Sequence, residues 1–134
     1  MVFDEPGGEL PLYPSSVRGV FQRECGSEGG ALGMERGVMV SDMQTGHGVC
    51  RVQWDSGSAQ DVLRPSAVAG RIKDADLLRR LTFHRFDVAG QPAGPHEFVL
   101  RRFAAPDVDA VLGTGFFSTH VVCPDPSRGR VAFR

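Results

Sequence analysis

The chain has 134 residues, of which 41% are hydrophobic and 23% are charged, and its formal net charge is −1. This composition is that of a folded globular protein, it excludes a largely disordered chain, and the length suits one ordinary domain. No apolar run approaches the roughly 18 residues that cross a bilayer, and the acidic start, with Asp4, Glu5 and Glu9, is unlike a signal peptide. We therefore expect a soluble, intracellular protein with no membrane partner.

The charge is unevenly distributed along the chain. Residues 1–70 contain five arginines and nine acids, for a net charge of −4, whereas residues 71–134 contain ten basic residues and seven acids, for a net charge of +3. This asymmetry allows a basic face in the second half but does not require a nucleic-acid partner.

The first third of the chain is rich in proline and glycine. Residues 1–18 contain three prolines, which exclude a helix, so we expect an extended N-terminal segment. Residues 17–23 follow as a candidate first strand. Residues 25–33 contain four glycines and predict a loop between strands. A phosphate-binding loop is not indicated, because no Gly-Lys-Ser/Thr ending follows.

The clearest pattern lies between residues 37 and 64. Residues 37–40 predict a strand, and residues 49–54 alternate so that Cys50, Val52 and Trp54 share one face. Asp55-Ser56-Gly57 then predicts a tight turn, with the glycine at a positive φ. Residues 59–64 are expected to pair back onto the preceding strand. The stretch thus predicts three consecutive antiparallel strands.

Residues 52–58, with the sequence Val-Gln-Trp-Asp-Ser-Gly-Ser, resemble the V-x-W-D-x-G-S segment of MIB/HERC2 domains. These are small SH3-like barrels found in some ubiquitin ligases. The resemblance covers about residues 37–77, where Arg64, Gly70 and an Ala-Asp-Leu at 75–77 stand near the family's later positions. Leu63 replaces a family tyrosine. The resemblance implies an SH3-like barrel, which we place at residues 19–70, acting as an interaction module.

The second half predicts a helix followed by antiparallel strands. The helix is expected over residues 72–81, where Asp74 can cap the N-terminus and two arginines end the last turn. The elements expected after it are strands at 82–88 and 96–103, a short helix at 106–112, and strands at 116–123 and 130–133. The predicted fold is therefore mainly β with one or two short helices. It comprises an SH3-like small barrel, then a short helix and an antiparallel α+β half at 71–134, with room for one shared core.

Residues for catalysis or metal binding are sparse. The four histidines are dispersed, and the three cysteines, Cys25, Cys50 and Cys123, are odd in number with no C-x-x-C pair. The sequence therefore predicts no metal site, no cofactor and no disulfide framework. Cys25 with His120 is the one combination that offers a nucleophile and a base, and it makes an enzyme the third of our function hypotheses.

The leading hypothesis is a non-enzymatic module that binds a protein or peptide, or a small structural subunit of a larger complex. We place its binding edge at His47, Trp54 and Asp55. The alternative is an RNA-binding subunit, because phenylalanines on the predicted strands of the second half alternate with arginines and offer a base-stacking surface. The arginines of that surface are Arg85, Arg101 and Arg102.

Overall fold

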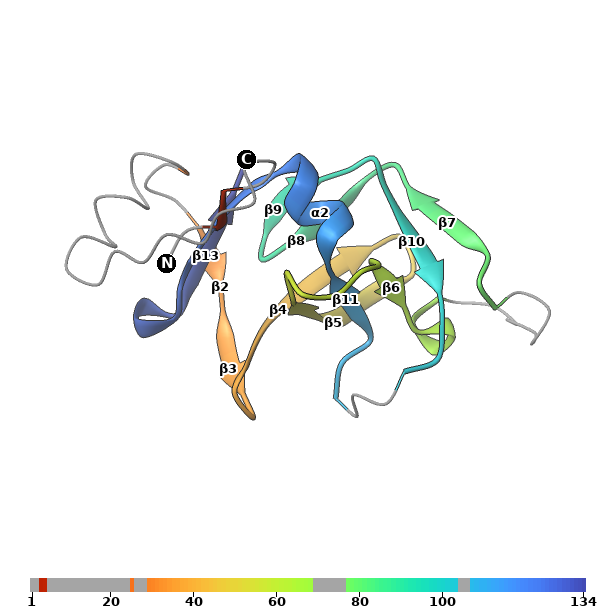
Figure 1. The fold of residues 1–134 in the computed structure, drawn as a ribbon, viewed down its shortest axis with the longest axis horizontal. Coiled ribbons are helices and arrows are strands. Elements are labelled where there is room, and N and C mark those ends of the chain that lie inside the picture. The colour runs from red at the N-terminus through yellow and green to blue at the C-terminus, as the bar shows by residue number, and fades with distance from the viewer. Residues whose placement is uncertain (1–2, 5–24, 26–28, 69–76, 104–106) are drawn as a thin grey trace.

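The computed structural model describes residues 3–4, 25, 29–68, 77–103 and 107–134, and it is mainly β (Figure 1). The described strands form two sheets that do not close into a barrel, so the SH3-like closure expected for residues 19–70 is not seen. Most of the predicted N-terminal segment at 1–18 and the candidate strand at 17–23 lie outside the described residues. Within the described residues, no helix combines the length and the apolar character needed to cross a bilayer.

The larger sheet has the strand order β7-β10-β6-β11-β5-β4-β8-β9, with β3 paired to β4. Its strands are β3 (Gly33–Glu35), β4 (Val38–Thr45), β5 (Gly48–Trp54), β6 (Val62–Leu63), β7 (Arg80–Phe83), β8 (Phe86–Val88), β9 (Gln91–Ala93), β10 (His96–Leu100) and β11 (Ala110–Leu112).

The hairpin of β4 and β5 confirms the alternation seen in the sequence. The two strands pair antiparallel from Met39 opposite Trp54 to Thr45 opposite Gly48. Cys50, Val52 and Trp54 are all buried, while the residues between them are at least partly exposed. Two strands of the predicted three-stranded unit are therefore paired as expected.

The third strand of that unit was predicted wrongly. Residues 59–64 do not pair back onto β5, because β11 lies between β5 and β6, parallel to β5 and antiparallel to β6. All three residues of β11 are buried. A strand buried on both faces needs partners on both edges, and β5 and β6 supply them. The turn at Asp55 therefore leads into a loop that passes around the end of β11.

The central strand β11 also corrects the helix predicted at 106–112. Residues 104–106 lie outside the described residues, and 110–112 are extended. The strand predicted at 116–123 is likewise wrong in its first half, because α2 (Thr114–Thr119) occupies it. Phe116 and Phe117 are both buried on this helix. An aromatic pair favours a strand locally, but the packing of both rings against the core decides for the helix.

The helix predicted at 72–81 falls mostly outside the described residues, which resume at Leu77. Where the chain is described, Leu77 and Leu78 form a turn and Arg80 begins β7, so the last turn of that helix is not formed. The strand predicted at 82–88 is two strands, β7 and β8, separated by a bend at residues 84–85. The predicted antiparallel return at 96–103 is confirmed over 96–100, with His96 opposite Phe83 in the pairing of β10 with β7, but residues 101–103 are not in the strand.

The smaller sheet contains β1 (Phe3–Asp4), β12 (Val121–Asp125), β13 (Arg130–Phe133) and β2 (Gly30–Ala31), in that order. The strand predicted at 130–133 is confirmed. Cys25 forms a disulfide with Cys123 of β12, which corrects the expectation that no disulfide forms. An odd number of cysteines does not exclude one disulfide. Cys50 is buried and free, and the other two cysteines pair across 98 residues.

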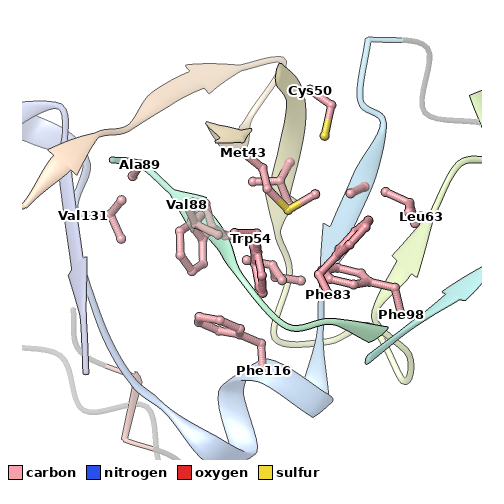
Figure 2. Packing of buried hydrophobic residues seen from close by; sticks show 14 of the residues in the cluster. Met43, Cys50, Trp54, Leu63, Phe83, Val88, Ala89, Phe98, Phe116 and Val131 are labelled. Carbon is pink, nitrogen blue, oxygen red and sulfur yellow. The ribbon is translucent and has the colours of Figure 1, made fainter. Parts of the chain in front are cut away.

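One hydrophobic core joins both halves of the sequence around Trp54 (Figure 2). Trp54 is 4% exposed, and its indole N–H donates a hydrogen bond of 2.9 Å to Ser41 Oγ. The rings of Phe116 and Trp54 meet edge to face, with centroids 5.7 Å apart. Helix α2 is therefore held over the sheet by contacts with the strand that leads into the Asp55 turn.

Candidate functional site

The turn after β5 holds the side chain of Asp55 in a defined position. The Asp55 backbone N–H donates to the Leu112 carbonyl at 2.9 Å, which ties the turn to the end of β11. The Gly57 N–H donates to Asp55 Oδ1 at 3.0 Å. Gly57 does not have the positive φ that the turn chemistry predicted. Its lack of a side chain matters instead because a Cβ would lie 3.3 Å from Asp55 Oδ1.

The loop that follows the turn is bonded to the start of α2. Thr114 donates to this loop twice, from its N–H to the Ser58 carbonyl and from its hydroxyl to the Ala59 carbonyl, both at 2.9 Å. A Cβ on Gly113 would lie 2.6 Å from the Ser58 carbonyl oxygen and 2.7 Å from that of Gln60. The close approach of the two backbones therefore requires glycine at position 113.

A buried carboxylate completes this link. Asp61 is 5% exposed, and its Oδ1 accepts the Gly113 N–H at 2.5 Å while its Oδ2 pairs with His96 Nε2. The His96 side chain is 10% exposed and packs between the rings of Phe98 and Phe116. Asp61 therefore connects three elements, the loop after Asp55, strand β10 and the start of α2.

An open cavity of about 920 Å³ lies beside the Asp55 turn. Its apolar wall includes Val62 of β6 and Val111 of β11, and its polar wall includes Ser58 and Gln60 of the loop. On the far side it is bounded by the segment that leaves β10, whose residues are Arg101, Arg102 and Phe103. Asp55 is the only carboxylate among the described residues that line this cavity.

A second cavity, of about 430 Å³, borders the same turn and shares Gln53 and Asp55 with the first. Asp55 lines it as well, together with an apolar wall formed by Met34, Val38 and Met39. Met34 is 51% exposed, so this wall presents apolar surface to solvent. Asp55 therefore lies at a boundary between a mixed cavity and an apolar surface.

Comparison with known proteins adds little to this geometry. No family model matches the chain, and no curated protein matches it. Among solved structures it is similar to the retroviral protease-like domain of Ddi1 from Leishmania major, with a TM-score of 0.47 and 16% identity. That alignment covers 71% of this chain and 91% of the other.

The residues predicted for the site fall in different places. Asp55, Arg101 and Arg102 line the same cavity. Trp54 lies in the core instead of at a binding edge. His47 is exposed in the β4–β5 turn, at the opposite end of β5 from Asp55, and Arg85 is exposed in the bend between β7 and β8. The structure therefore brings together three of the six predicted binding residues.

The phenylalanines predicted as a base-stacking surface lie mostly in the core. Phe83, Phe86, Phe98, Phe116 and Phe117 are each at most 8% exposed. Phe103 is half-buried at the cavity rim, with the Arg64 guanidinium 4.7 Å from the centre of its ring. The described aromatic side chains therefore contribute little surface on which bases could stack.

The pair of Cys25 and His120 does not form a nucleophile and base. Cys25 is bonded to Cys123, and the His120 ring stacks on Phe116 with centroids 3.9 Å apart. Burial lowers the pKa of His120, against the opposing effect of its hydrogen bond to the Phe116 carbonyl. Burial also raises the pKa of the free Cys50 thiol, to about 11, which disfavours the reactive thiolate.

No sequence motif pointed to Asp61, His96 and Gly113 as parts of the site. Asp61 and His96 are 35 residues apart, and their pairing depends on the parallel contact of β6 with β10. Gly113 directly follows the apolar run at 110–112. A usable signal was the placement of a glycine directly after an apolar run, since glycine in such a position often marks a close backbone approach.

Proposed function

We propose that two copies of this chain form a hydrolase that cuts peptide bonds with a pair of Asp55 carboxylates. The observation that carries the proposal is the position of Asp55, half-buried at the edge of an open cavity and held by the Gly57 N–H at 3.0 Å. A side chain held in one geometry before substrate binds is a favourable arrangement for a catalytic group.

A second copy is needed because direct attack of water on an amide, without a metal or a covalent nucleophile, uses a general base and a general acid together. Two carboxylates that share one proton fill both roles, one taking a proton from water and the other donating to the carbonyl oxygen. The described part of one chain offers this cavity a single carboxylate, Asp55. A two-fold dimer, the commonest symmetric assembly, would supply the second from the same position.

The surface beside the turn supports such an assembly. The cavity with walls of Met34, Val38 and Met39 borders Asp55, so apolar contact there would bring two copies together next to the carboxylates. Burial of an exposed methionine from each chain is favourable, since apolar area removed from water contributes roughly 25 cal/mol per Å². Contact across this face is therefore compatible with a pair of Asp55 side chains.

The substrate we propose is an extended peptide. The larger cavity is open, and it combines apolar groups from Val62 and Val111 with polar groups from Ser58 and Gln60. Alternating side chains and backbone amides of an extended peptide need both kinds of surface.

The test is cleavage of a mixed peptide library, read by mass spectrometry, by wild type, Asp55→Asn and the control Asp87→Asn. Asp87 is exposed on β8 and does not line either cavity beside Asp55. We expect cleavage by wild type and the control, and a loss of at least about 100-fold with Asp55→Asn. Equal cleavage by Asp55→Asn would refute the proposal, as would a dimeric wild type that cuts nothing.

The second candidate is a peptide-binding module with no catalytic activity, as the sequence predicted. The observation that favours it is the same single carboxylate, because the described residues that line this cavity in one chain include no second carboxylate and no histidine. Peptides that are retained uncut by wild type and by Asp55→Asn alike would support this candidate over the hydrolase.

A further inference from the structure

We infer that the cavity beside Asp55 selects peptides with an acidic side chain, and that Arg101 determines this selection. The inference rests on the proposed function in that it names the substrate class of the same site. Arg101 and Arg102 both line the cavity and are both exposed, whereas Asp55 is the only carboxylate among the described residues of its lining. The described lining is therefore positive on the side away from the turn.

The side chain of Arg101 is held toward the cavity by a contact across it. Its Nη1 donates to Gln60 Oε1 at 3.1 Å, which joins the segment after β10 to the loop after the Asp55 turn. The Arg101 backbone N–H also donates to the Leu63 carbonyl at 3.1 Å, so its position in the chain is defined. A guanidinium carries five N–H donors, so this single side-chain bond leaves donors for a second acceptor.

A carboxylate is the group that best matches these donors. Arginine and carboxylate form paired, charge-assisted hydrogen bonds, and the planar guanidinium favours this geometry over that of a single acceptor. Phe103 and Val62 line the same cavity and would cover the aliphatic part of a glutamate side chain. A peptide glutamate therefore finds both an apolar contact and a charged partner in this cavity.

The size of the cavity limits where that residue lies in the substrate. A volume of about 920 Å³ corresponds to a space roughly 10 Å across, which an extended peptide crosses in about three residues. The acidic residue is therefore placed within about three positions of the bond next to Asp55.

RNA is a poorer occupant of the same cavity. A nucleic-acid strand carries a negative charge on every nucleotide, so it would place phosphates beside the Asp55 carboxylate as well as beside the arginines, whereas a peptide can present a single carboxylate at Arg101 and uncharged residues at Asp55. Stacking of bases would depend on Phe103, which is half-buried and already covered by Arg64. We therefore assign the positive charge to recognition of a peptide carboxylate.

The test measures binding separately from cleavage, by fluorescence anisotropy of labelled peptides on the full-length Asp55→Asn variant. Peptide pairs differ only in Glu or Gln at one position, and we expect about tenfold tighter binding of the Glu form. Arg101→Gln should reduce this preference to about twofold or less, and Arg101→Glu should reverse it in favour of a Lys peptide. Arg85→Gln, an exposed arginine in the β7–β8 bend, is the matched control and should keep the preference.

Equal affinity for the Glu and Gln peptides, or a preference that survives in Arg101→Glu, would overturn the inference. Tighter binding of a single-stranded RNA than of the Glu peptide would also overturn it. If peptides are cut by wild type without regard to acidic residues, this inference fails while the hydrolase stands. If Glu peptides bind selectively but are never cut, the hydrolase fails while the selection by Arg101 stands.

Discussion

Replacing Asp61 with alanine should destabilise the fold more than any other single change near the site. The carboxylate is 5% exposed and has two partners, the Gly113 N–H at 2.5 Å and His96 Nε2. Alanine leaves both groups buried without a partner, and each such loss costs about 1–3 kcal/mol. Breaking a buried pair by removing one member costs about 3–5 kcal/mol, so we expect a loss in that range.

Urea unfolding followed by fluorescence measures this loss, because Trp54 is the only tryptophan and is buried. The control Asp87→Ala removes an exposed carboxylate from β8 and should change stability by less than about 0.5 kcal/mol. His96→Phe keeps an aromatic ring between its neighbours, and a cycle with Asp61→Ala isolates the pairwise energy. A loss below about 1 kcal/mol for Asp61→Ala would refute the role given to this carboxylate.

Three further outcomes are expected. Gly113→Ala should destabilise the fold by about 1–3 kcal/mol in the same urea assay, because its Cβ would lie 2.6 Å from the Ser58 carbonyl oxygen; an unchanged midpoint would contradict this. Burial raises the pKa of Cys50 to about 11, so this thiol should react with iodoacetamide at pH 8 only after unfolding, as peptide mass mapping would show. Because the unfolded thiol ionises near pH 9, the contribution of the protonated thiol to stability is complete below about pH 9 and is lost as pH rises toward 11. Burial lowers the pKa of His120, so the neutral ring contributes stability above its ordinary pKa of 6.5, and this contribution is lost as pH falls. His120→Asn should therefore reduce the difference between the unfolding midpoints at pH 7 and pH 5.

Local patterns predicted those elements whose partners lie close in sequence. The alternation in β5 placed Trp54 on the buried face, and the hairpin with β4 follows from the short turn at residues 46–47. The pairing of β7 with β10 could also be predicted, since two apolar runs flank a loop rich in glycine and proline. In each case the residues that pair are separated by few positions, so the signal is local.

The arrangement around Asp55 could not be derived in the same way. Strand β11 has three residues and pairs with β5, more than 50 positions earlier, so its burial is evident only from the assembled sheet. The disulfide between Cys25 and Cys123 spans 98 residues, and counting cysteines carries no information about such a pair. The resemblance to MIB/HERC2 domains around residues 52–58 stays a prediction.

Part of the site could be predicted from charge and turn chemistry. Asp55 was recognised through its turn, and Arg101 and Arg102 through the basic second half, although for different functions. Their common cavity depends on β6 lying beside β10 in parallel, a contact between segments more than 30 residues apart. Trp54, predicted at the binding edge, is buried in the core and contacts Phe116 of α2 instead.

The measurement that tests the central claim most directly is a titration of wild type with Asp55→Asn at constant wild-type concentration, after exchange of subunits. If each active site needs Asp55 from both copies, random pairing lowers cleavage to about one half at equal amounts and about one tenth at ninefold excess. The same excess of Asp87→Asn should raise cleavage, because that chain keeps Asp55. Cleavage that is unaffected by added Asp55→Asn would contradict the account, since Asp55 would then act within a single chain.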